Sequence, residues 1–129
     1  MPEQVLIYSR FPKTLMLRIG EHFELMDATG KPPREIFAAD HLAGVRAMIT
    51  AGGTPLGGDV MDMMPKLGAI VCYGTGYDGV DLKAAAARKI TVGHSPGANA
   101  ASVADIAVTL MLAATRRVLV ADDYVRSGN

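Results

Sequence analysis

A glycine-rich turn, Gly74-Thr75-Gly76-Tyr77-Asp78-Gly79, constrains the fold more than any other stretch of this sequence. It follows the apolar run 69–73 and precedes the alanine-rich segment 81–88, which is the order strand, turn, helix. Glycines in such a turn let backbone N–H groups point outward at the carboxyl end of a strand, next to a helix N-terminus. The turn therefore predicts an α/β fold with a small-anion site.

The same glycines match G-x-G-x-x-G, the fingerprint of dinucleotide-binding turns. That fingerprint also requires an acidic residue about 20 positions further on, which holds the ribose hydroxyls. The corresponding stretch, 91–97, reads TVGHSPG and contains no Asp or Glu. The turn therefore favours a carboxylate over a pyrophosphate.

The rest of the apolar pattern places this turn in a regular alternation of strands and helices. Short apolar runs bounded by Gly, Pro and polar residues predict strands, and longer amphipathic segments between them predict helices. This rhythm indicates a flavodoxin-like, parallel five-stranded sheet with helices on both faces. The predicted strands are 5–8, 24–27, 46–50, 69–73 and 90–92, and the predicted helices are 12–22, 33–41, 59–64 and 81–88.

From residue 101 onward the pattern changes to one long helix. Apolar side chains recur at helical spacing over about 25 residues, which is about 37 Å of helix. Asn99 or Ser102 is the expected N-cap, and Ser127-Gly128 the expected end. A helix with so many apolar side chains has to bury them, so we expect it to pack on a second domain or subunit. The alternative is that it lies over the sheet.

Composition excludes several classes of protein. The 129 residues carry 13 basic and 13 acidic side chains, and no basic block exceeds Arg116-Arg117, which argues against nucleic acid or an anionic membrane as partner. The single cysteine, Cys72, lies in an apolar strand and is expected to be buried. The start of the chain lacks a signal-peptide pattern, and the apolar stretch 106–115 is too short to span a bilayer, so we expect a cytoplasmic protein.

Ligands of parallel sheets bind beyond the carboxyl ends of the strands, where the turns 52–53, 74–79 and 95–101 are expected. Gly52 and Gly74 let backbone approach a ligand, and the N–H groups of Thr75 and Gly76 are the expected carboxylate donors. The alternative is that these glycines only form tight turns. Asn99 suits a carbonyl ligand, although an asparagine at this place is also a common helix cap.

No set of residues predicts catalysis or a metal site. His94 is the one histidine near the expected cleft, and no partner that would set its tautomer is evident in the sequence. His22 and His41 are expected to be solvated, and the three histidines lack metal-ligand spacing. Asp78 and Asp81 are expected to cap the following helix rather than act as an acid–base pair.

Residues 67–129 resemble the D-isomer-specific 2-hydroxyacid dehydrogenases, especially their glyoxylate and hydroxypyruvate reductase branch. Residues 1–66 match this family only in the rhythm of strands and helices. The matching pieces are YGTGYD at 73–78, VDL at 80–82, AAAAR at 84–88, SPGAN at 95–99, SVAD at 102–105, Arg116-Arg117 and VRSG at 125–128.

The resemblance implies that residues 1–98 are a substrate-binding domain and that 99–129 is a hinge helix leading to a nucleotide-binding domain and taking part in a homodimer. It implies a backbone cradle for the substrate carboxylate at Thr75 and Gly76, with Asn99 beside the substrate and Ser102 near the nicotinamide. The implied substrate is a small 2-keto or 2-hydroxy acid such as glyoxylate or hydroxypyruvate, and the implied cofactor is NAD or NADP.

In the family, the true nucleotide fingerprint and the catalytic Arg, Glu and His lie downstream of the segment matched here. We therefore expect the chain as given to be a truncated piece without activity of its own. A different class is also open, because corepressors that share this architecture act as interaction or dimerisation modules. A receiver domain is disfavoured, since Ser9-Arg10 follow the first strand where an acidic cluster is needed.

Overall fold

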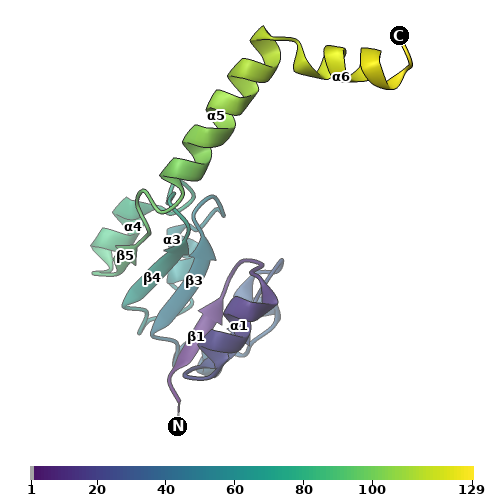
Figure 1. The fold of residues 1–129 in the computed structure, drawn as a ribbon. Coiled ribbons are helices and arrows are strands. Elements are labelled where there is room, and N and C mark those ends of the chain that lie inside the picture. The colour runs from purple at the N-terminus through teal and green to yellow at the C-terminus, as the bar shows by residue number, and fades with distance from the viewer. Residues whose placement is uncertain (1) are drawn as a thin grey trace. The chain divides into compact units, whose positions relative to one another are not determined.

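The computed structural model of the chain describes residues 2–129. They form two compact units, the first ending at Pro96 and the second beginning at Gly97 (Figure 1). The first unit contains the sheet with its covering helices, and the second contains helices only.

A five-stranded parallel sheet forms the centre of the first unit, with the strand order β2-β1-β3-β4-β5. This confirms the predicted flavodoxin-like arrangement. Strand β2 lies on one side of β1, and β3, β4 and β5 follow in order on its other side. The topological switch point therefore lies between β1 and β3. The strands are β1 (Gln4–Ile7), β2 (Glu24–Asp27), β3 (Ala47–Ala51), β4 (Ala69–Tyr73) and β5 (Thr91–Gly93).

Short helices connect these strands, and two of them differ from the prediction. The predicted helix 33–41 is a 3-10 turn followed by a separate short helix, because Ala38 between them has extended backbone. Asp59 was expected to cap a helix that runs through Met64, which is wrong, because Gly57 is the N-cap and the helix ends at Met61. The elements are α1 (Lys13–Gly20), the 3-10 turn Pro33–Glu35, α2 (Ala39–Leu42), α3 (Gly58–Met61) and α4 (Leu82–Ala87).

The cap predicted for the helix after the glycine turn is present at one of the two candidate residues. The Ala84 N–H donates to Asp81 Oδ1 at 2.9 Å, so Asp81 caps α4 as predicted. Asp78 was also expected to cap this helix, and that expectation is wrong, because Asp81 occupies the N-cap. A side-chain oxygen at an N-cap satisfies a backbone donor that the helix leaves free.

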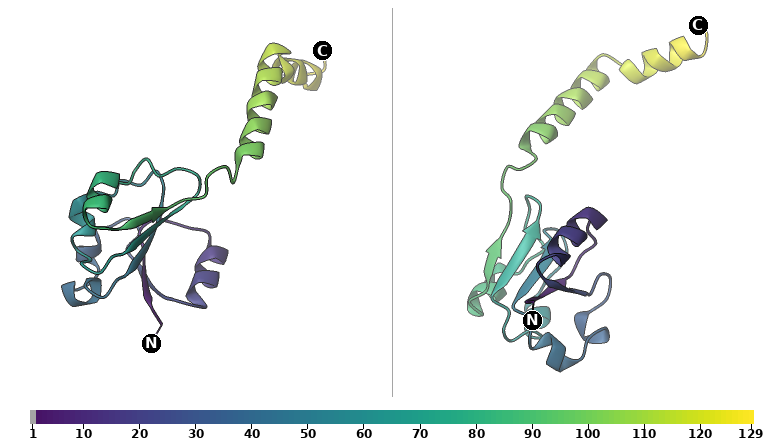
Figure 2. Two further views of the ribbon diagram at one scale, coloured as in Figure 1. Left: turned by 90° about the vertical axis from the view of Figure 1, so that its left-hand side faces the viewer. Right: turned by 60° about the horizontal axis from the view of Figure 1, so that its bottom comes forward.

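The hydrophobic core lies on one face of the sheet. Leu6, Met48 and Ile70 are fully buried in the middle of three adjacent strands, and α2, α3 and α4 pack over them (Figure 2). Cys72 is buried on the same face, as predicted. The methionines of α3 and of the turn after it fill this core, which also agrees with the sequence interpretation.

The opposite face of the sheet is covered unevenly. Helix α1 lies over Val5 and Ile7, both of which are buried. On β4, by contrast, Val71 and Tyr73 point to this face and are 47% and 52% exposed. Parallel sheets are normally covered on both faces, so the described residues of the first unit leave part of this face open.

The second unit consists of two helices, α5 (Ala100–Thr115) and α6 (Val118–Arg126), and not of the single long helix predicted. The break falls at Arg117, which has left-handed backbone with φ 52° and ψ 40°. This conformation costs a non-glycine residue about 1–2 kcal/mol. The sequence has no Gly or Pro at this place that would predict a break. Asn99 stands at the N-cap of α5, but its side chain makes no capping bond.

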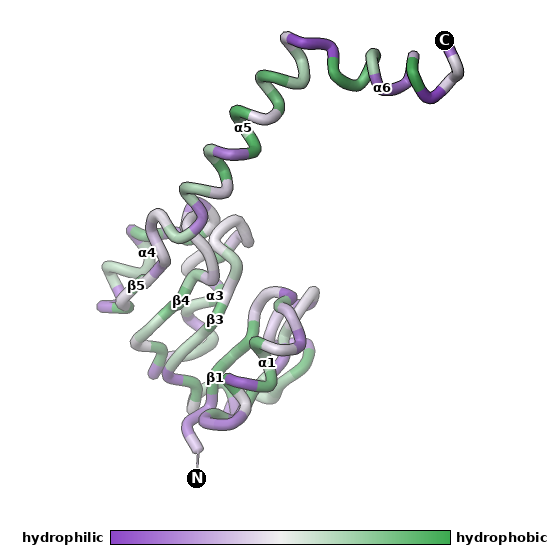
Figure 3. The backbone as a smooth tube through the Cα atoms, in the orientation of Figure 1, coloured by the Kyte–Doolittle hydropathy of each residue, from purple (hydrophilic) through white to green (hydrophobic). Residues whose placement is uncertain are grey.

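Neither helix of the second unit buries a residue. Apolar residues recur along both of them, as the green segments of α5 and α6 show in Figure 3. Large exposed apolar side chains are Val103, Ile106, Val108, Leu110, Met111, Leu112, Val118, Leu119, Val120, Tyr124 and Val125. Among the described residues, no helix is both long enough and apolar enough to span a membrane.

Candidate functional site

The glycine turn that opened the sequence interpretation lies at the carboxyl end of β4. Its first residue, Gly74, has a φ of +117°, which side-chain-bearing residues rarely adopt, so this position requires glycine. The N–H groups of Thr75 and Gly76 donate no hydrogen bond within the part of the chain that the structure describes. These two donors are therefore available to a ligand.

The carbonyl groups of the same two peptides are both held by the end of β5. The Gly74 carbonyl accepts the Ser95 N–H at 2.9 Å, and the Thr75 carbonyl lies 2.9 Å from Nδ1 of His94. In a planar trans peptide the C=O and N–H bonds point in opposite directions. The N–H groups of Thr75 and Gly76 therefore both point away from β5. Successive backbone donors of this kind bind small anions.

His94 has a partner after all, which corrects the sequence interpretation. Because a backbone carbonyl only accepts hydrogen bonds, Nδ1 of His94 carries the proton in this contact. The edge of the His94 ring also meets the Tyr77 ring, with centroids 4.8 Å apart and planes at 71°. The sequence did not reveal the contact because the partner is a main-chain atom 19 residues away.

Gly52 lies at the end of β3 and packs directly on the glycine turn. A Cβ atom built on Gly52 would lie 1.8 Å from the Gly76 carbonyl oxygen, and Gly79 donates its N–H to the Gly52 carbonyl at 2.7 Å. A Cβ on Gly79 would similarly lie 2.3 Å from the Thr54 carbonyl oxygen. The close approach of two backbones explains why Gly52 is glycine, and a ligand contact by Gly52 stays a prediction.

A buried group of hydroxyls, which the sequence interpretation missed, fixes the β3 turn from the other side. Ser9, at the end of β1, places its Oγ 3.1 Å from Thr50 Oγ1 and 2.7 Å from Thr54 Oγ1. The same Oγ accepts the Ala51 N–H at 2.9 Å. Ser9 and Thr50 are buried, and the network spans the switch point between β1 and β3. Small hydroxyl residues within and near the ends of two adjacent strands were the available signal.

The pKa shifts in the first unit are explained by burial and by one ion pair outside the glycine turn. Asp62 receives two hydrogen bonds of 2.8 Å from the Arg88 guanidinium, which lowers the pKa of the Asp62 carboxyl and raises that of Arg88. Burial raises the pKa of the Cys72 thiol, so the reactive thiolate is disfavoured. Burial, followed by the charge of Asp59, raises the pKa of the Tyr8 phenol. None of these groups lies in the glycine turn.

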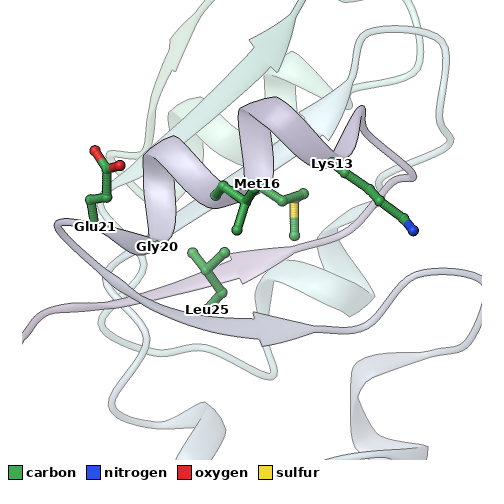
Figure 4. Close-up of a pocket in the computed structure, with 6 residues that line it drawn as sticks. Lys13, Met16, Gly20, Glu21 and Leu25 are labelled. Carbon is green, nitrogen blue, oxygen red and sulfur yellow. The ribbon is translucent and has the colours of Figure 1, made fainter.

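The described residues contain no cluster of three metal-ligating side chains. A groove of about 570 Å³ between α1 and β2 is lined by apolar side chains and the stems of charged ones (Figure 4). It lies on the flank of the sheet and lacks converging polar groups, so we do not assign it as the ligand site. The groove is lined by Lys13, Met16, Leu17, Gly20, Glu21 and Leu25.

The structure is that of an α/β protein with a parallel flavodoxin-like sheet and two free backbone donors at the carboxyl end of β4, the edge at which sheets of this kind bind ligands. Residues 5–121 match the family described as D-isomer specific 2-hydroxyacid dehydrogenase, catalytic domain. The chain belongs to this family, as the sequence resemblance indicated.

Similar proteins agree with this assignment. Glyoxylate reductase of Korarchaeum cryptofilum is 34% identical over 129 residues, which are 99% of this chain and 39% of that protein. A glyoxylate/hydroxypyruvate reductase of Arabidopsis thaliana is 33% identical over 105 residues, covering 81% of this chain and 32% of that protein. The chain thus spans about two fifths or less of the length of these relatives.

Solved structures show the same fold. A 2-hydroxyacid dehydrogenase of Ketogulonicigenium vulgare superposes with a TM-score of 0.91 at 29% identity, over 99% of this chain and 41% of that one. The NADPH-dependent glyoxylate/hydroxypyruvate reductase of Sinorhizobium meliloti, solved with NADP and malonate, gives a TM-score of 0.83 at 29% identity, over 99% and 39% of the two chains.

The remaining predicted site residues, Asn99 and Ser102, belong to the second unit. Ser102 lies in the first turn of α5, and both residues are exposed. Their proximity to a substrate or a nicotinamide therefore stays a prediction from the resemblance.

Proposed function

We propose that this chain is the substrate-binding part of an NAD(P)-dependent 2-hydroxyacid dehydrogenase that reduces a small 2-keto acid such as glyoxylate or hydroxypyruvate. The observation that carries this proposal is the pair of free N–H groups at Thr75 and Gly76, whose peptides are held in place through the carbonyls of Gly74 and Thr75. The family membership and the reductases among the similar proteins support it. In this proposal residues 1–98 form the substrate-binding domain.

The cradle binds the carboxylate of the keto acid and leaves the adjacent carbonyl carbon exposed for reduction. Hydrogen bonds from backbone N–H groups to a carboxylate are charge-assisted and about twice as strong as neutral ones. Because the donors belong to backbone held at both neighbouring turns, binding costs little reorganisation. Gly74 and Gly52 contribute by allowing this backbone arrangement, and the family resemblance is the basis for proposing Asn99 as a further substrate contact.

The cofactor of the proposed reaction is NAD or NADP, which in its reduced form would supply a hydride to the keto carbon. The described residues fit only a small part of such a cofactor. The glycine turn is not followed by a ribose-binding acid, and Ser102 is the single residue proposed to lie near the nicotinamide. No described residue is assigned as the proton donor, so we expect this chain alone to be inactive.

Residues 99–129 are proposed to act as the hinge and to form a homodimer interface. The absence of buried residues in α5 and α6, together with their many exposed apolar side chains, supports a surface that another chain or domain covers. The same observation favours a second candidate function, a non-catalytic interaction module like the corepressors of this architecture. The single buried thiol fits a reducing compartment, and we expect the protein in the cytoplasm.

Amide NMR of the full chain tests the proposed function. Glyoxylate is expected to shift the Thr75 and Gly76 amide signals in a saturable manner, whereas glycolaldehyde, which lacks the carboxylate, is expected to leave them in place. Gly76→Val is expected to abolish the shifts without unfolding the chain, since a Cβ at Gly76 meets only the Asp78 carboxylate at 3.3 Å. Equal shifts with both compounds would refute the carboxylate cradle, and the absence of any shift with glyoxylate would favour the interaction module.

A further inference from the structure

We infer that His94 is a positioning residue of the carboxylate cradle, acting through the Thr75–Gly76 peptide. The inference rests on the proposed function, because it assigns a role within the same site. It concerns a residue outside the glycine turn, at the end of β5, to which the sequence assigned no partner.

The hydrogen bond between His94 and the Thr75 carbonyl can run in only one direction. Nδ1 of His94 lies 2.9 Å from the Thr75 carbonyl oxygen, within the range of a well-formed hydrogen bond. The carbonyl accepts, so Nδ1 donates, and the neutral ring is held as the Nδ1–H tautomer. This leaves Nε2 without a proton in the neutral ring.

The peptide that His94 holds also carries one of the two free donors. The Thr75 carbonyl and the Gly76 N–H belong to one planar unit and point in opposite directions. Fixing the oxygen toward β5 therefore fixes the Gly76 N–H away from β5, toward the proposed ligand. A hydrogen bond to the carbonyl also polarises the peptide and strengthens its N–H as a donor.

His94 supplies a restraint that the neighbouring contacts do not replace. The preceding peptide is held separately, through the Ser95 N–H and the Gly74 carbonyl at 2.9 Å. The following peptide is held by the close contact of the Gly76 carbonyl with Gly52. His94 alone among the described residues bonds the carbonyl between these two, and Tyr77 supports its ring at 4.8 Å.

A pair of substitutions of matched shape tests this role. His94→Asn keeps a donor one bond beyond Cγ, where Nδ1 stands in histidine, whereas His94→Leu has the same branching without a donor. Glyoxylate affinity is measured for the full chain from the Gly76 amide shift. His94→Leu is expected to weaken binding about three- to tenfold, the worth of one hydrogen bond, and His94→Asn is expected to restore most of it.

Two further readouts separate positioning from folding and from the proposed function. His94 is exposed, so both variants are expected to unfold at the wild-type temperature. The ring nitrogen shifts of wild-type His94 are expected to report the Nδ1–H tautomer. If His94→Leu binds glyoxylate with the affinity of the wild type, or if the wild-type ring is the Nε2–H tautomer, this inference is overturned and the proposed function is not. Absence of glyoxylate binding to the wild type would overturn the proposed function.

Discussion

Substitution of Gly52 by alanine tests whether the two glycine turns depend on direct backbone packing. The new Cβ would lie 1.8 Å from the Gly76 carbonyl oxygen, whereas ordinary contacts begin at 3.4 Å, so one turn must move by about 1.6 Å. Such a shift breaks the 2.7 Å bond from the Gly79 N–H to the Gly52 carbonyl. Overpacking and a lost buried hydrogen bond each cost about 1–3 kcal/mol, and we expect a loss of about 3 kcal/mol in total.

The neighbouring glycine provides a matched control. A Cβ on Gly53 meets nothing within 4 Å, so Gly53→Ala is expected to change the stability by no more than about 1 kcal/mol. Urea unfolding followed by circular dichroism measures both variants. With a slope of about 1.5 kcal/mol per molar urea, Gly52→Ala is expected to lower the midpoint by about 2 M. Equal midpoints for the two variants would refute the packing argument.

Three further predictions concern other parts of the chain. Asp81→Ala is expected to cost about 1 kcal/mol in thermal or urea unfolding through loss of the α4 cap, and an equal loss in Asp78→Ala would contradict this. Hydrogen bonds from Arg88 hold the pKa of Asp62 below its ordinary 3.8, so the ion pair stabilises the fold above this pH and the stabilisation is lost as the pH falls further. Asp62→Asn is therefore expected to reduce the fall of the urea midpoint at acid pH. An unchanged fall would count against the ion pair. Leu110→Asp is expected to weaken self-association about a hundredfold in analytical ultracentrifugation. Leu17→Asp changes a similarly exposed leucine of α1 and is expected to leave self-association unchanged. Identical sedimentation of the two variants would argue against an interface formed by α5 and α6.

Much of the first unit was predictable because its signals are local. Apolar runs such as 69–73 form strands wherever a sheet buries them, and the alternation with helices restricts the sheet to parallel strands. Asp81 was predictable as a cap because capping needs only its own helix. The glycine turn was predictable as a turn with outward backbone N–H groups because of its place between a strand and a helix, and its role as an anion site stays a prediction.

The break between α5 and α6 was not predictable, since the apolar period continues through Arg116-Arg117 without Gly or Pro. Helical periodicity reports which face is apolar, and a single left-handed residue leaves that pattern almost unchanged. The split of the predicted helix 33–41 was missed for a related reason, because short helices carry too few turns for a clear period.

By itself, then, the sequence determined the fold class, the family resemblance and the turn that offers backbone donors. Tertiary structure alone decided which atoms hold that turn in place: Nδ1 of His94 on the Thr75 carbonyl, Gly52 against the Gly76 carbonyl, and the hydroxyl group of Ser9 on the β3 turn. The physical reason is that these contacts join strand ends that lie 19 or more residues apart in the chain. Main-chain acceptors, moreover, are the same in every residue, so no side-chain pattern records which of them is used.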